Sequence, residues 1–105
     1  MPLTREFKDT LKARAASDPA FRAALLSDAV ELLLSGDVAT GRQVLRNYIN
    51  ATIGFEALAE ATGRPAKSLM RMFGASGNPT AQSLFSVISQ LQKSTGVQLA
   101  VAAAA

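Results

Sequence analysis

The chain has 105 residues, 49% of them hydrophobic and 18% charged, with a net charge of +3, which fits one globular domain and excludes a chain that is disordered throughout. Cys and His are both absent, so disulfides, thiol nucleophiles, Cys/His zinc sites and imidazole catalysis are excluded, and we expect neither an enzyme nor a cofactor. No apolar run approaches the roughly 20 residues of a membrane span, and the charged N-terminal stretch is unlike a signal peptide, so we expect a cytoplasmic protein with no membrane partner.

Three helices are predicted in residues 1–51, which form a helical leader. Thr4 caps the first, which has only a thin apolar stripe. Asp18 and Pro19 open the second, whose apolar positions are too many for one narrow face, so it is predicted to be the central, most buried helix. Asp37 caps the third. That helix is expected to turn Val38, Val44, Leu45, Tyr48 and Ile49 toward the interior.

Residues 53–74, IGFEALAEATGRPAKSLMRMFG, have the pattern of two short helices joined by a tight turn at Gly63. Phe55, Leu58 and Ala59 give the first helix an apolar face, and Ala66, Leu69, Met70 and Phe73 give one to the second. At about 100° per residue, Lys67, Ser68 and Arg71 share the opposite arc of the second helix, and Arg64 lies just before it. This spacing predicts a helix-turn-helix.

A last helix completes the predicted core, residues 52–95. Asn78, Pro79 and Thr80 are interpreted as a stop followed by a capped start, and Gly96 ends the helix. Its expected buried set is Leu84, Phe85, Val87, Ile88 and Leu91. In the tail, residues 96–105, the alternation of Val97, Leu99 and Val101 with other residues predicts a possible short strand, whose partner strand must come from elsewhere.

Charge is distributed unevenly along the chain. Residues 1–20 hold four cations and three acids, and residues 21–62 hold three cations and five acids. From Gly63 onward there are four cations and no acid. The positive field therefore begins at the second helix of the motif, and a polyanion is the partner that this distribution favours. For a helix-turn-helix, the expected polyanion is double-stranded DNA.

The second helix of such a motif lies in the major groove of DNA, where an Arg or Lys can donate to guanine O6 and N7. Lys67, Ser68 and Arg71 are the predicted groove-facing side chains, and Arg64 and Lys93 are predicted to meet phosphate. The competing interpretation is an ordinary helical hairpin with a solvated basic face. Acidic pairs at helical spacing are interpreted as solvated faces, and Met70 and Met72 as core residues.

Residues 50–92 resemble the Cro/cI-type helix-turn-helix antitoxins, the HigA-like antidote proteins of addiction modules. The resemblance is carried by GFEALAEATG, by the basic helix ending LMRMF and by the turn SGNPT. It implies an all-α, lambda-repressor-like helix-turn-helix core with an N-terminal helical extension. It further implies a DNA-binding homodimer that represses its own operon and neutralises a RelE-like or HigB-like toxin. Pro65 departs from the pattern, because such proteins often carry a capping Ser or Thr there.

The apolar residues outnumber the inward positions of a small helical domain, so part of them should lie at an interface. A second copy is the expected partner, since a two-fold dimer on a palindrome suits a motif that reads only a few base pairs. The alternative function is a protein-interaction module, toxin-binding or structural, whose helix-turn-helix no longer reads DNA.

Overall fold

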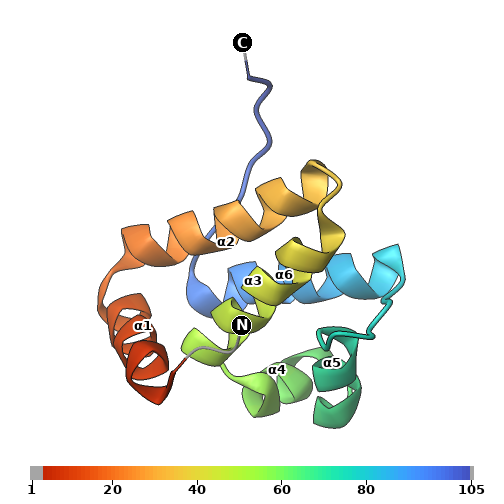
Figure 1. Cartoon of the computed structure of the whole chain (residues 1–105), viewed down its shortest axis with the longest axis horizontal. Coiled ribbons are helices and arrows are strands. Elements are labelled where there is room, and N and C mark those ends of the chain that lie inside the picture. The colour runs from red at the N-terminus through yellow and green to blue at the C-terminus, as the bar shows by residue number, and fades with distance from the viewer. Residues whose placement is uncertain (1–3, 105) are drawn as a thin grey trace.

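Six α-helices form within residues 4–104, the part of the chain that the computed structural model describes. In Figure 1, α2 lies along the top and α4 and α5 lie at the bottom, with α3 and α6 between them. Together they make an all-α globule. None of the helices in this range combines the length and the hydrophobicity that a transmembrane span requires. Residues 1–3 and 105, the ends of the predicted leader and tail, lie outside the described residues. The helices are α1 (Arg5–Ser17), α2 (Pro19–Leu34), α3 (Val38–Ala51), α4 (Phe55–Thr62), α5 (Ala66–Met72) and α6 (Ala81–Thr95).

The helix starts predicted from capping residues are confirmed. In four helices the side chain of the N-cap accepts a hydrogen bond from the backbone N–H three residues later, which satisfies one of the unpaired donors of the first turn. Gly63 and Gly96 end α4 and α6 in the left-handed conformation, each with φ of +69°. The capping residues are Thr4 (3.1 Å to Phe7 N), Asp18 (3.1 Å to Phe21 N), Asp37 (3.3 Å to Thr40 N) and Thr80 (3.1 Å to Ser83 N).

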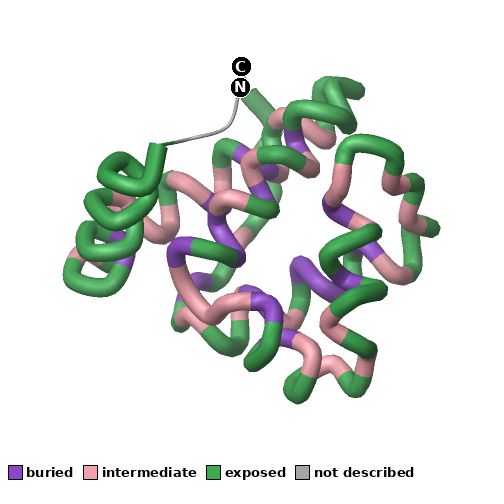
Figure 2. The backbone as a smooth tube through the Cα atoms, turned by 60° about the horizontal axis from the view of Figure 1, so that its bottom comes forward, coloured by how far each residue is buried: buried purple, intermediate pink, exposed green. Residues whose placement is uncertain are grey.

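The most buried helix is α3, so the prediction that this would be the second helix is wrong. Leu45, Tyr48 and Ile49 of α3 are fully buried, whereas α2 buries only Leu26 and Ala29. The reason is position: α2 packs against α3 and α1 with one side and leaves its other side to solvent. The first helix, α1, is exposed along almost its whole length (Figure 2).

A glycine sets the close packing of α2 on α3. Gly41 is buried on α3, and a Cβ atom there would lie 2.7 Å from Cδ2 of Leu33 on α2. The absence of a side chain therefore lets the two helices approach closely. A single hydrophobic cluster unites residues of α2, α3, α4, α5 and α6.

Three apolar residues predicted to be buried are exposed instead: Val38, Met70 and Phe85. Val38 is the first residue of α3 and lies at the end of the helix, beyond the core. Met70 and Phe85 each follow a buried leucine directly, and neighbouring residues on a helix point about 100° apart. The buried faces of α5 and α6 therefore include fewer apolar residues than the sequence analysis assigned to them.

The predicted strand is not formed in the tail, as far as residue 104. Val97 is buried against the helical core instead, and the N–H of Leu99 donates to Oε1 of Gln92 at 2.8 Å. Beyond Leu99 the chain is exposed and runs past α2 away from the body (Figure 1). A strand needs a partner that takes up its backbone hydrogen bonds, and the described residues contain no other strand.

A hydrogen bond from the buried Tyr48 ties the leader to the last helix. The hydroxyl oxygens of Tyr48 on α3 and Thr95 on α6 are 2.6 Å apart. Because the Thr95 hydroxyl donates its proton to the carbonyl of Leu91 at 2.7 Å, Tyr48 is the donor to Thr95. Burial raises the pKa of Tyr48 above its ordinary value of 10.0, although the bond to Thr95 and the charge of Arg22 lower it in part.

We predict that Tyr48→Phe costs about 1 kcal/mol of unfolding free energy at neutral pH, because the hydrogen bond is lost while the ring remains. The folded pKa lies above the unfolded one, so the contribution of Tyr48 is fully present below pH 10 and falls as the pH rises beyond it. The difference between wild type and Tyr48→Phe in urea unfolding should therefore shrink above pH 10. A difference that grows there would contradict the assignment.

Candidate nucleic-acid interface

The turn between α4 and α5 is three residues long and is built from backbone geometry. Gly63 adopts the left-handed conformation, and its N–H and that of Arg64 both donate to the carbonyl of Ala59, at 2.9 and 3.2 Å. Pro65 follows as the N-cap of α5, with φ of −61°, and no side chain caps the helix. The departure at Pro65 therefore removes the side-chain cap but leaves the start of the helix at Ala66.

The inner face of α5 holds the helix in place. Leu69 and Phe73 are buried, and the ring of Phe73 lies 6.4 Å from that of Phe55 at the start of α4, tilted by 52°. Met72 is half-buried against the same cluster. Because this face is fixed, the opposite face of α5 is presented to solvent in a defined orientation.

The outer face of α5 carries the three side chains predicted for the groove. Lys67, Ser68 and Arg71 are all exposed, and within the described residues no hydrogen bond or ion pair engages their side chains. Met70 joins them, with 46% of its surface exposed. The sequence prediction placed Met70 on the buried face, together with Ala66, Leu69 and Phe73. On the helix, however, Met70 points about 100° away from Leu69, whereas Met72 points only about 60° away from Leu69 in the other direction.

The side chain of Arg64 has a structural role that its sequence position did not indicate. It is half-buried, and its Nη1 donates to Oγ of Ser83 at 3.3 Å. Ser83 also accepts from the hydroxyl of Thr80, at 3.0 Å, so the three residues connect the turn to the first turn of α6. Arg64 thus adds positive charge beside α5 while it joins the turn to the next helix.

A shallow groove of about 300 Å³ runs along one side of α5. Ser68 and Arg71 form one wall, and Ser76, Asn78 and Ser83 contribute hydroxyl and amide groups from the loop and from α6. These three polar residues were not among the predicted site residues. Ser76 and Asn78 are small polar residues in the loop that follows the basic helix, and Ser83 lies in the first turn of α6. Hydroxyl and amide groups of this kind commonly contact phosphate.

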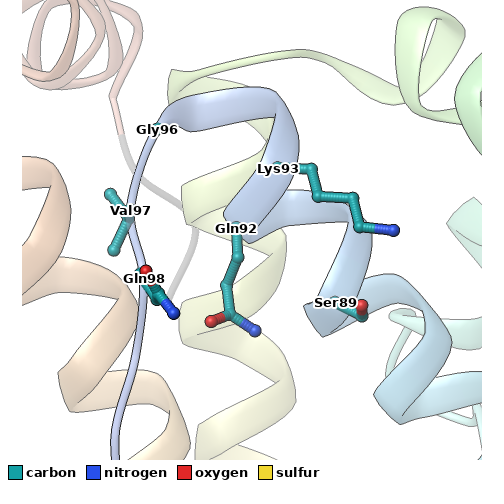
Figure 3. Close-up of a pocket in the computed structure, with 6 residues that line it drawn as sticks. All are labelled: Ser89, Gln92, Lys93, Gly96, Val97 and Gln98. Atoms are coloured by element: carbon teal, nitrogen blue, oxygen red, sulfur yellow. The ribbon is translucent and has the colours of Figure 1, made fainter.

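The structure places Lys93 apart from the other four predicted residues. It lies in the last turn of α6, about 15 Å along the helix from Ser83 at 1.5 Å per residue. There it lines a separate hollow of about 430 Å³ between α6 and the tail (Figure 3). The other lining residues are Ser89, Gln92, Gly96, Val97 and Gln98.

A residue of the leader completes the support of α5. Arg42 on α3 donates through Nη1 to the carbonyl oxygens of Gly74, at 2.8 Å, and Met72, at 3.4 Å. These carbonyls lie at the C-terminal end of α5, where intrahelical partners are missing and positive charge is favourable. The sequence did carry a signal, since Arg42 precedes Leu45 by three residues and so shares its buried face.

The site is thus an exposed cationic helix face held by a buried inner face, by Arg64 on one side and by Arg42 at its end. The arrangement can bind a polyanion, and the described residues 4–104 include no group of three or more acidic side chains that would hold a metal ion. No protein-family model, curated protein or solved structure matches this chain.

We predict that Arg42→Ala lowers the unfolding free energy by about 1 to 2 kcal/mol, because two carbonyls lose a charged donor. Backbone amides of α5 should also exchange faster with deuterium than in the wild type. Arg46→Ala is the matched control, since Arg46 lies one turn further along α3, is exposed and has no hydrogen bond or ion pair within residues 4–104. Equal effects of the two substitutions would show that Arg42 does not cap α5.

Proposed function

We propose that this protein is a cytoplasmic, sequence-specific DNA-binding transcriptional regulator whose α4 and α5 form a helix-turn-helix of the lambda-repressor-like kind. The observation that carries the proposal is the outer face of α5. Lys67, Ser68 and Arg71 are exposed together on a short helix whose opposite face is anchored by Leu69 and Phe73. From Gly63 onward the sequence contains no acidic residue.

The dimensions of α5 suit the major groove. An α-helix with its side chains is about 10 to 12 Å across, and the groove is about 12 Å wide. The seven residues of α5 span about 10 Å along the helix axis at 1.5 Å per residue. Lys67 and Arg71 lie one turn apart, so both can reach guanine O6 or N7 within a stretch of about three base pairs. Arg64 and the polar groove of Ser76, Asn78 and Ser83 lie at the side of the helix, where phosphates would pass.

A homodimer belongs to this proposal. Contacts with about three base pairs give little discrimination, and two copies on a palindrome with half-sites about 34 Å apart would double the reading length.

The antitoxin role rests on the family resemblance of residues 50–92. It requires a toxin partner, and a RelE-like or HigB-like toxin encoded in the neighbouring reading frame is the expected one. Co-purification of that gene product with the chain, together with rescue of growth, would support the role. If no toxin gene lies next to the gene for this chain, the antitoxin role fails and the proposal is reduced to a stand-alone DNA-binding regulator.

A second candidate function, a protein-interaction module, is favoured by a different surface. Leu25, Leu32 and Val44 line an apolar groove of about 570 Å³ on α2 and α3, and the carboxylates of Asp28 and Glu31 rim it. In Figure 1 this groove's helix α2 lies on the opposite side of the molecule from α5. The two functions therefore use separate surfaces and can coexist in one protein.

We predict that Lys67→Ala and Arg71→Ala each weaken binding to a specific DNA site by about 1 to 3 kcal/mol, or roughly 5- to 150-fold in Kd. The site would be found by footprinting on the protein's own promoter and the affinity measured by gel shift. Circular dichroism should be unchanged, because both side chains are exposed.

Lys93→Ala is the control for charge, since it removes one cation far from α5. We expect Lys93→Ala to lose less affinity than the other two variants, and to lose the same amount for every DNA sequence. The slope of log affinity against log salt concentration should fall by the equivalent of one phosphate contact at most. Unchanged affinity in Lys67→Ala and Arg71→Ala would disprove the groove assignment and favour the protein-interaction module.

A further inference from the structure

Met70 is an exposed apolar side chain within a cationic surface. It is the one large hydrophobic residue of α5 with an exposed side chain, whereas Leu69 is buried and Met72 is half-buried against the core. Single exposed apolar residues are common on proteins and need no explanation by themselves. The position of Met70 is what makes it informative.

On the helix, Met70 stands beside the predicted base-reading residues. It follows Lys67 by three residues, so the two side chains point about 60° apart and are neighbours on the helix surface. A DNA group beside the base that Lys67 contacts is therefore within reach of Met70. Arg71 is the next residue along the chain. Met70 therefore lies at the edge of the face that carries these two cations, about 100° from Arg71. If α5 lies in the major groove, Met70 meets base edges beside those that the cations contact.

The major groove offers one apolar group on the base edges, the C5-methyl group of thymine. The other groups that distinguish the base pairs there are hydrogen-bond donors and acceptors, whereas a thioether sulfur donates no hydrogen bond and accepts only weakly. Methionine is also flexible enough to follow the position of a methyl group. The chemistry that fits Met70 in this setting is therefore thymine.

We infer that Met70 is a specificity-determining residue that contacts a thymine methyl group in the DNA site, an inference that rests on the proposed function. Its place relative to the other contacts follows from helix geometry. Three residues of α-helix rise about 4.5 Å, and successive base pairs are about 3.4 Å apart. The thymine thus lies one or two base pairs from the base that Lys67 contacts.

The test uses the full chain and a DNA site selected from a pool of random duplexes. Each thymine of the selected site is replaced in turn by uracil, which removes the methyl group and keeps every hydrogen-bonding group. For the wild type, we expect one thymine per half-site at which this change weakens binding about four-fold, the effect of losing one buried methyl-sized group. Met70→Ala should bind the thymine and uracil sites equally.

Met70→Leu serves as the matched variant, because it keeps an apolar side chain of similar volume and should retain sensitivity to the methyl group. Phe85→Ala removes an exposed apolar side chain from α6 and should behave as the wild type. Since Met70 is substantially exposed, its variants are expected to fold, which circular dichroism would verify.

Two results would overturn the inference while the proposed function stands. One is a selected site at which no thymine responds to uracil in the wild type. The other is a response that persists unchanged in Met70→Ala, which would assign the methyl contact to another residue. If the wild type selects no DNA sequence at all, the proposed function fails, and the role of Met70 in reading thymine fails with it. A change in oligomeric state on Met70→Ala, with methyl sensitivity retained, would instead assign Met70 to a contact between copies.

Discussion

The burial of the inner face of α5 is the constraint on which the candidate site depends. A helix of seven residues is far too short to be stable by itself in water, because few hydrogen bonds form against the cost of starting the helix. Leu69 and Phe73 supply the missing free energy by packing into the core, and Phe73 also contacts Phe55 across the motif. The orientation of Lys67 and Arg71 follows from this packing, since neither side chain is held by a contact of its own within the described residues.

The N-terminal half of the chain takes part in the same support. Residues of α2 and α3 belong to one hydrophobic cluster with those of α4, α5 and α6, so the leader shares its core with the motif. Two polar contacts add direction to this packing. Arg42 reaches from α3 to the end of α5, and Tyr48 donates to Thr95 on α6. Helices that looked like an extension in the sequence thus brace the helices that carry the proposed site.

Two surfaces of different chemistry lie on opposite sides of the molecule. The side formed by α5 is cationic and offers small polar groups, whereas the groove on α2 and α3 combines apolar side chains with Asp28 and Glu31. A polyanion fits the first side and is repelled by the second. Because the two surfaces are separate, the proposed DNA-binding and protein-binding roles would use different residues.

The sequence by itself determined the helices, because their boundaries depend on local chemistry. Thr4, Asp18, Asp37 and Thr80 accept backbone hydrogen bonds three residues ahead, and Gly63 and Gly96 adopt a left-handed conformation that other residues rarely take. The exposure of Lys67, Ser68 and Arg71 also followed from helical periodicity alone.

Only the tertiary structure decided which helix is central, how wide each buried face is, and which distant residues meet. Met70 is exposed, and Val97 packs into the core and does not form a strand. Arg64 and Arg42 bind partners 19 and 32 residues away in the sequence. Each of these outcomes depends on neighbours in space that the local sequence does not specify.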